Sequence, residues 1–168
     1  MKRFKNEIPE GFTNPTASPQ TKEEFLKWQE ANQLWWDQHP MRYDWRRKIT
    51  AQDFTKEFYK EIDKRFFSDA RDYMPWKKIP FDTLIDFDSL KNKNVLEIGV
   101  GSGSHAQLLA TYAGSFTGID LSDYAVRSTS ERMRLFDLNG SIHQMEAENL
   151  TFNDGTFDFV WSWGVIHH

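Results

Sequence analysis

Hydrophobic residues in the first half of the chain recur at helical spacing. Phe25, Trp28, Ala31 and Trp35 form the first such series, and Thr21 precedes them as a candidate N-cap with acidic residues in the next turn. We therefore expect a helix that begins at residue 21 and ends before residue 40, with a mostly aromatic apolar face.

A second series recurs at every fourth position. It consists of Phe54, Phe58, Ile62 and Phe66, and charged residues fill most of the positions between them. The pattern predicts a second amphipathic helix, for which Thr50 is the expected N-cap and the prolines at 75 and 80 the expected stop. Residues 81–90 read as a linker or a single turn of helix.

The second half of the chain shows a different pattern. Short apolar runs at 94–98, 115–119, 141–145 and 157–162 read as strands. Helical segments at about 104–113 and after Ser122 separate the first three of them. This alternation predicts an α/β fold with a parallel sheet, preceded by a helical cap.

A glycine-rich turn follows the first expected strand directly. Gly99, Gly101 and Gly103 let the backbone approach a ligand without an intervening Cβ atom. The dinucleotide fingerprint G-x-G-x-x-G needs a third glycine where Ser104 stands, so a pyrophosphate ligand is weakly supported.

Two acidic residues accompany this turn. Glu97 precedes the first glycine by two positions, and its negative charge would repel a pyrophosphate and favour a cationic ligand. Asp120 ends the second expected strand about 20 residues after that glycine, where a carboxylate can bind both ribose hydroxyls. S-adenosyl-L-methionine, an adenosine derivative with a sulfonium and an ammonium, fits both features.

These motifs resemble those of class I S-adenosylmethionine-dependent methyltransferases, of the type 11-like group. Residues 95–103 and Gly118-Ile-Asp-Leu-Ser122 are similar to the first two family motifs, and the likeness continues through 146–152 and 157–168. The resemblance implies a Rossmann-like fold of which this chain carries the first four of seven strands. It also implies S-adenosyl-L-methionine as cofactor and S-adenosyl-L-homocysteine as product.

The resemblance also assigns residues to the adenine. Glu146 would bind the adenine amino group and the Ala147 amide a ring nitrogen, although most relatives carry aspartate there and Glu148 competes for the role. Leu121 would pack on the adenine face or serve as an ordinary core leucine. Ser162 ends the fourth strand at the same edge.

The aromatic stretch 35–45 has two readings. Its side chains can fill the core between the two cap helices, or the stretch can form a lid in which Trp36 or Tyr43 faces the sulfonium or the substrate. Tyr43 is the preferred lid residue because a phenol offers both a ring and a polar tip.

Methyl transfer from a sulfonium needs alignment and exclusion of water but no nucleophilic side chain. A general base helps when the acceptor is a hydroxyl or a protonated amine, and His167 or His168 stands where a relative would present one. The same pair could be a surface feature or the stub of a purification tag.

Composition narrows the remaining choices. A hydrophobic content of 39% with 27% charged residues fits one soluble domain, and a formal net charge of −4 argues against a nucleic-acid partner. The basic cluster Arg42, Arg46, Arg47 and Lys48 is either a solvated helix flank or an anion site. Without cysteine there is no disulfide or thiolate chemistry, and the scattered histidines give no metal-ligand spacing. With no membrane-spanning run, we expect a cytoplasmic protein.

The predicted organisation is an extended arm at 1–20, an aromatic helical cap at 21–90 and a cofactor-binding half-domain at 91–168. Relatives continue with three more strands, so we expect a piece of a longer protein, or another chain paired with the edge of strand four. The predicted function is methyl transfer to a small-molecule acceptor. A non-catalytic cofactor-binding module that serves a partner chain, and a dinucleotide-dependent oxidoreductase, are the alternatives.

Overall fold

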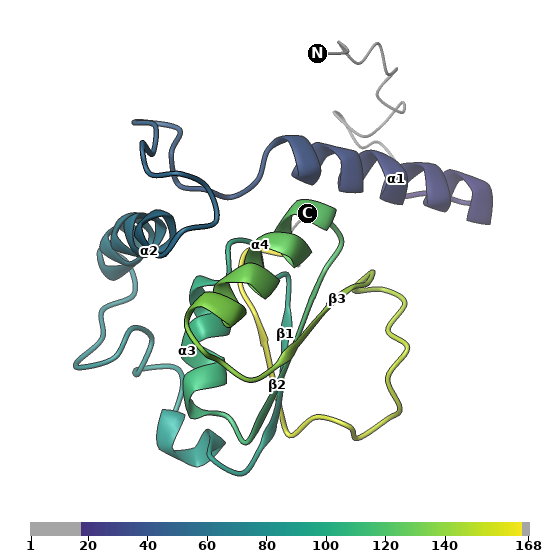
Figure 1. The fold of residues 1–168 in the computed structure, drawn as a ribbon. Coiled ribbons are helices and arrows are strands. Elements are labelled where there is room, and N and C mark those ends of the chain that lie inside the picture. The colour runs from purple at the N-terminus through teal and green to yellow at the C-terminus, as the bar shows by residue number, and fades with distance from the viewer. Residues whose placement is uncertain (1–17, 166–168) are drawn as a thin grey trace.

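The computed structural model describes residues 18–165, and its centre is a four-stranded parallel sheet (Figure 1). The strands are β1 (Asn94–Ile98), β2 (Ser115–Asp120), β3 (Ser141–Gln144) and β4 (Phe159–Ser162). Their order is β3-β2-β1-β4, and every neighbouring pair is parallel. The α/β fold with a parallel sheet is therefore confirmed.

The register brings the carboxyl ends of the strands together at one edge. Ile98 of β1 lies opposite Ile119 of β2 and Ser162 of β4. The glycine turn that leaves β1 and the acid that ends β2 consequently share this edge. Because the chain moves from β1 to β2 and β3 on one side and returns to β4 on the other, the crevice between β1 and β4 is the expected ligand position.

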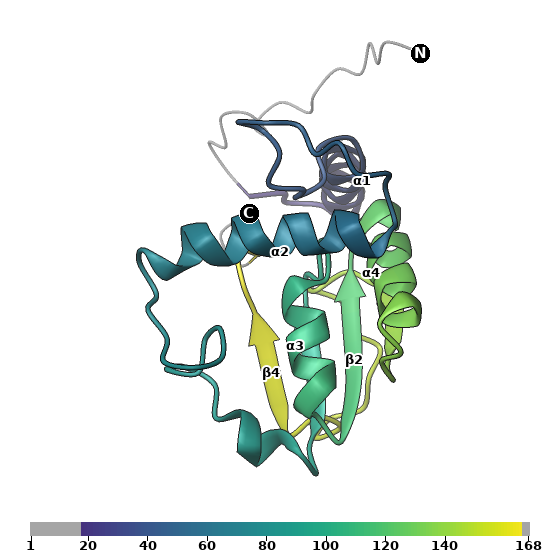
Figure 2. The same ribbon diagram turned by 60° about the vertical axis from the view of Figure 1, so that its left-hand side comes forward.

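One face of the sheet is covered by helices α3 (Ser104–Tyr112) and α4 (Asp123–Leu135), which Figures 1 and 2 show on the same side. Leu109 and Met133 from these helices pack with Val95 and Phe116 of the sheet in the main core. The connection from β3 to β4 runs on the opposite side without a helix. Val160, on β4, is 53% exposed.

Two cap helices lie across the carboxyl ends of the strands. In Figure 2 the arrowheads of β2 and β4 point toward α2 (Lys56–Arg71), and in both views α1 (Lys22–Gln38) lies at this same end of the sheet. Thr21 caps α1 as predicted, in a reciprocal capping box with Glu24. No residue of α1 is fully buried, whereas α2 buries Phe58, Ile62 and Phe66. None of the helices within residues 18–165 has both the length and the apolar character needed to cross a bilayer.

The predicted N-cap of the second helix was wrong. Thr55 caps α2, because its Oγ1 accepts a hydrogen bond from the Phe58 amide at 3.3 Å and donates one to the Gln52 carbonyl at 2.7 Å. Phe54 has a φ of 62° and lies outside the helix. The helix also ends at Arg71, ahead of both prolines, and the expected turn of helix in 81–90 is a 3-10 helix, Phe87–Leu90.

A buried ion pair joins the cap to the sheet domain. Arg132 of α4 is 1% exposed and pairs with Asp63 of α2. The same guanidinium donates to the Ser102 carbonyl in the glycine turn at 3.1 Å, and Ser104 Oγ donates to Asp63 at 2.7 Å. Asp63 therefore links α2 directly to the start of α3, and through Arg132 to the glycine turn.

Candidate functional site

A cavity of about 750 Å³ opens at the carboxyl edge of the sheet, beneath the cap. Its walls come from the strand ends, the glycine turn, α1, α2 and the segment that joins the two cap helices. Its lining includes most of the predicted cofactor residues: Tyr43, Glu97, Gly99, Gly101, Asp120, Leu121, Glu146, Ala147 and Ser162. Gly103 does not line it, and His167 and His168 lie outside the described residues.

Asp120 fixes the conformation of the glycine turn through a hydrogen bond. One carboxylate oxygen of Asp120 accepts from the Gly101 amide at 3.0 Å, and the other accepts from the Ser122 amide at 2.9 Å. Gly101 has a φ of 52°, and a Cβ placed on it would meet nothing within 4 Å. The backbone of the turn thus faces open space, and each Asp120 oxygen retains acceptor capacity for a ligand.

Gly103 lies against helix α4. A Cβ at this position would lie 3.0 Å from Thr129 Oγ1 and from a carbon of Arg132. Thr129 donates to the Gly101 carbonyl at 3.1 Å. Gly103 therefore lets the turn pack closely on α4, on the side away from the cavity.

Glu97 is a buried carboxyl group in the cavity wall. It is 2% exposed, and its Oε2 has no hydrogen-bond partner among residues 18–165. Burial raises the pKa of Glu97 well above its usual value, and the nearby Asp120 charge adds to the effect. A buried carboxyl without a partner is costly, and a cationic ligand group would remove that cost.

His105 is a cavity residue that the sequence analysis did not single out. It lies on the first turn of α3, with Nδ1 3.9 Å from Glu97 Oε1 and with Nε2 unpaired within the described chain. The rings of Phe66, Phe81 and Trp161 contact it edge to face. Burial, assisted by the charge of Arg132, lowers the pKa of His105 to about 3, so the imidazole is neutral at neutral pH.

The buried imidazole should make stability depend on pH. The unfolded chain binds a proton at His105 below its usual pKa of 6.5, but the folded protein does not until about pH 3. Between pH 7 and pH 5 this difference destabilises the native state by about 2 kcal/mol. Denaturant unfolding at both pH values should show that His105→Asn loses less stability than wild type on acidification.

The comparison with His105→Asn is needed because Glu97 and Asp120 have raised pKa values. Their folded forms take up protons more readily than the unfolded chain, so they stabilise the protein as pH falls. A variant that loses as much stability as wild type over this interval would contradict the assignment of a neutral His105.

Tyr43 packs against other aromatic rings and also lines the cavity. Its ring packs against Phe66, with centroids 4.9 Å apart, and against Trp45 at 5.1 Å, while it also lines the cavity. Burial raises the pKa of its phenol. Tyr43 is thus both a core residue and part of the cavity wall.

Glu146 and Glu148 both line the cavity after β3, and they differ in their hydrogen-bond partners. Glu148 accepts a hydrogen bond from Gln29 of α1 at 3.3 Å, whereas Glu146 Oε1 is buried and unpaired within residues 18–165. Burial raises the pKa of Glu146, with a further contribution from Glu148. Of these two acids, Glu146 is therefore the one with a buried, unpaired oxygen in the described part of the chain.

Residues 95–168 match the family described as "Methyltransferase domain". A phthiotriol/phenolphthiotriol dimycocerosates methyltransferase from Mycobacterium tuberculosis is 37% identical over 46% of this chain and 29% of its own length. A Methanocaldococcus jannaschii protein assigned as a protein N5-glutamine methyltransferase is 38% identical over 42% of this chain and 36% of its own. The chain thus spans about a third of the length of the curated relatives it matches.

The fold is similar to a crystal structure from Methanococcus maripaludis. That protein is assigned as an S-adenosyl-L-methionine-dependent methyltransferase. The similarity has a TM-score of 0.50 at 20% identity and covers 71% of this chain and 55% of the other. At this identity the likeness concerns the arrangement of the sheet and helices.

Proposed function

We propose that the protein binds S-adenosyl-L-methionine in the cavity and transfers its methyl group to a small-molecule acceptor, because residues 95–168 match the methyltransferase domain family and the cavity is lined by most of the residues expected to hold the cofactor. The observation that carries the cofactor assignment is Glu97, a buried carboxyl with an unpaired oxygen beside an open glycine turn. A pyrophosphate would add negative charge next to Glu97 and Asp120, whereas the ammonium and sulfonium of this cofactor would balance it.

Each wall of the cavity would then take one part of the cofactor. Asp120 would accept hydrogen bonds from the ribose hydroxyls while it holds the turn through Gly101. Glu146 and the Ala147 amide would bind the adenine edge, and Leu121 would pack on its face. These assignments are supported by the lining of the cavity and by the unpaired oxygen of Glu146.

When bound, the cofactor supplies a methyl group already activated by positive charge. The chain therefore needs only to orient the acceptor in line with that group and to exclude water. Tyr43 and the cap helices would do so by closing the cavity from above. His167 or His168 would accept a proton from a hydroxyl or amine acceptor.

A small acceptor is supported by the chain's own charge and shape. The formal net charge is −4, and the cap contributes aromatic side chains to the cavity wall. The names of the two relatives refer to different acceptors, phthiotriol or phenolphthiotriol dimycocerosates in one and a protein glutamine in the other. The acceptor class is therefore proposed from this chain and not taken from either relative.

Calorimetric titration with S-adenosylhomocysteine, adenosine and NAD tests the proposal. We expect S-adenosylhomocysteine to bind more tightly than NAD. Glu97→Gln should weaken S-adenosylhomocysteine by about tenfold or more but leave adenosine unchanged, because adenosine lacks the ammonium. Tighter binding of NAD, or an equal loss for both adenosine compounds, would contradict the proposed cofactor and the role of Glu97 respectively.

A further inference from the structure

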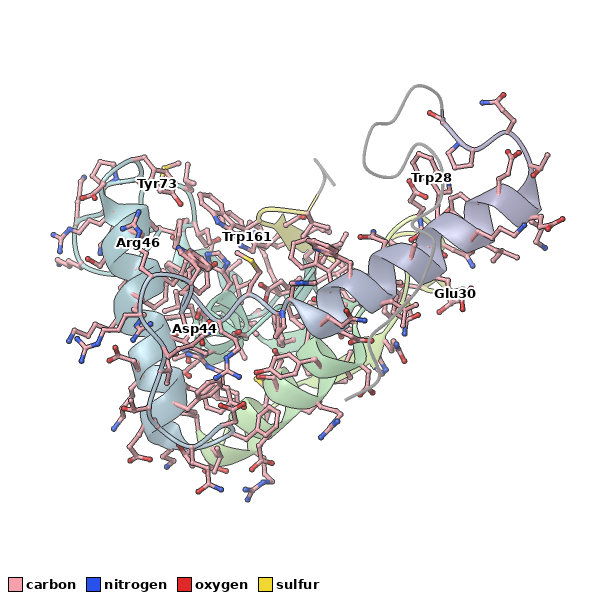
Figure 3. All side chains as sticks on the ribbon, turned by 90° about the horizontal axis from the view of Figure 1, so that it is seen from above. Trp28, Glu30, Asp44, Arg46, Tyr73 and Trp161 are labelled. Atoms are coloured by element: carbon pink, nitrogen blue, oxygen red, sulfur yellow. The ribbon has the colours of Figure 1, made fainter. Side chains whose placement is uncertain are left out.

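A second, smaller hollow lies beside the cofactor cavity, between α2 and the segment that precedes it. It has a volume of about 290 Å³. Its lining contains four basic and two acidic side chains, although the chain as a whole carries net negative charge: Arg46, Arg47, Lys64, Arg65, Glu61 and Asp69. Figure 3 shows Arg46 and Tyr73 on this side of the molecule, beside α2.

The structure divides the basic cluster that the sequence suggested. Arg42 forms a two-pronged ion pair with Asp53, with contacts of 2.7 and 2.9 Å, and Lys48 lies 3.7 Å from Asp44. The side chains of Arg46 and Arg47, in contrast, have no hydrogen-bond or ion-pair partner in the described part of the chain.

Helix α2 adds two more cations to the hollow. Lys64 is exposed and, within residues 18–165, also unpaired. Arg65 pairs with Glu61 at 3.0 Å and donates to the Tyr43 carbonyl at 3.1 Å and to the Arg47 carbonyl. Arg65 therefore fixes the segment 43–47 onto α2. The other three cations of the hollow, Arg46, Arg47 and Lys64, have no partner within the described residues.

The hollow and the cofactor cavity share two lining residues, Tyr43 and Asp69. Trp45, which is 58% exposed, lines the hollow and contacts the Tyr43 ring. A molecule with its charged end in the hollow could therefore lie against Tyr43 and extend toward the cavity. Aromatic walls suit a ring-bearing molecule, and the three cations suit its anionic end.

We propose that this hollow binds the carboxylate or phosphate group of the methyl acceptor, which makes the acceptor an anionic molecule with an aromatic or other apolar body. This proposal rests on the proposed function. Asp69 is the one acidic residue of the hollow that Arg65 does not engage, and it also lines the cofactor cavity.

Titration of the whole chain with inorganic phosphate, succinate and phenyl phosphate tests the site. The triple variant Arg46→Gln, Arg47→Gln, Lys64→Gln should bind whichever of the first two anions wild type prefers about tenfold more weakly or worse. The control variant Lys22→Gln, Lys60→Gln, Lys91→Gln removes the same charge from exposed positions outside both cavities and should bind it as wild type does. No binding by wild type, or an equal loss in the control, would overturn the anion site.

Phenyl phosphate tests the link to the acceptor. Its ring should increase affinity over inorganic phosphate, and NMR should detect contacts from the ring to Tyr43 and Tyr73, which line the cofactor cavity. Contacts to Trp45 alone would overturn the acceptor assignment. Both triple variants should retain wild-type affinity for S-adenosylhomocysteine, because the substituted residues do not line the cofactor cavity. If wild type itself did not bind S-adenosylhomocysteine, that result would contradict the proposed function, whereas the anion site is tested by phosphate and succinate alone.

Discussion

Asp120→Asn is expected to weaken the binding of S-adenosylhomocysteine by about 2 kcal/mol or more, a factor of about 30. The carboxylate accepts from the amides of Gly101 and Ser122 through its two oxygens. An asparagine turns one of these oxygens into a donor, which would face another donor. The variant thus disturbs the glycine turn and removes a charged acceptor for the ribose. Isothermal titration calorimetry measures the effect.

Asp123→Asn is the matched control for this experiment. Asp123 lies three residues further along the chain, in the exposed first turn of α4, where its carboxylate is 3.6 Å from Arg127. It does not line the cavity. We expect wild-type affinity in this variant. Equal affinities for Asp120→Asn and Asp123→Asn would show that the cofactor ribose does not bind at Asp120.

Asp63→Ala is expected to destabilise the folded protein by about 3 to 5 kcal/mol, because it leaves the Arg132 charge buried without its carboxylate. Arg132 would retain hydrogen bonds to the Gln107 side chain and the Ser102 carbonyl. It would also retain its position over the Tyr59 ring, 5.2 Å from the centroid. None of these neighbours carries negative charge. Denaturant unfolding followed by circular dichroism measures the loss.

Two further variants identify the origin of that loss. Glu23→Ala also removes a carboxylate from an ion pair, with Lys27, but both side chains are mostly exposed and little change is expected. Combining Asp63→Leu with Arg132→Met removes both charges and should recover much of the stability. If the double variant were as unstable as Asp63→Ala, packing and not the unpaired charge would be the cause.

The parts of the fold that depend on local pattern could be predicted. The glycine turn, the four strands and the cap at Thr21 each follow from residues within a few positions of one another. The Thr50 cap failed because Phe54 takes a left-handed backbone conformation just before Thr55, which no helical pattern reveals. Whether Thr50 or Thr55 caps the helix depends on how the loop before the helix packs.

The parts of the site that depend on distant residues could not be predicted. His105 and Glu97 are eight positions apart, but the aromatic rings that surround His105 come from α2, the segment before β1, and β4. Its position two residues after the last glycine was the one available signal. The pairing of Arg132 with Asp63 spans 69 residues, and the division of the basic cluster into paired and unpaired members depends on where α2 lies.

The aromatic enclosure of His105 also has a magnetic consequence. Phe66, Phe81, Trp161 and Trp163 contact the imidazole at tilted or perpendicular angles, with centroids between 4.6 and 5.7 Å away. Ring currents from four neighbours should displace the proton resonances of His105 far from their usual positions. Any molecule that enters the cavity and displaces one of these rings would change the chemical shifts of the His105 protons. These shifts therefore report whether the cavity is occupied.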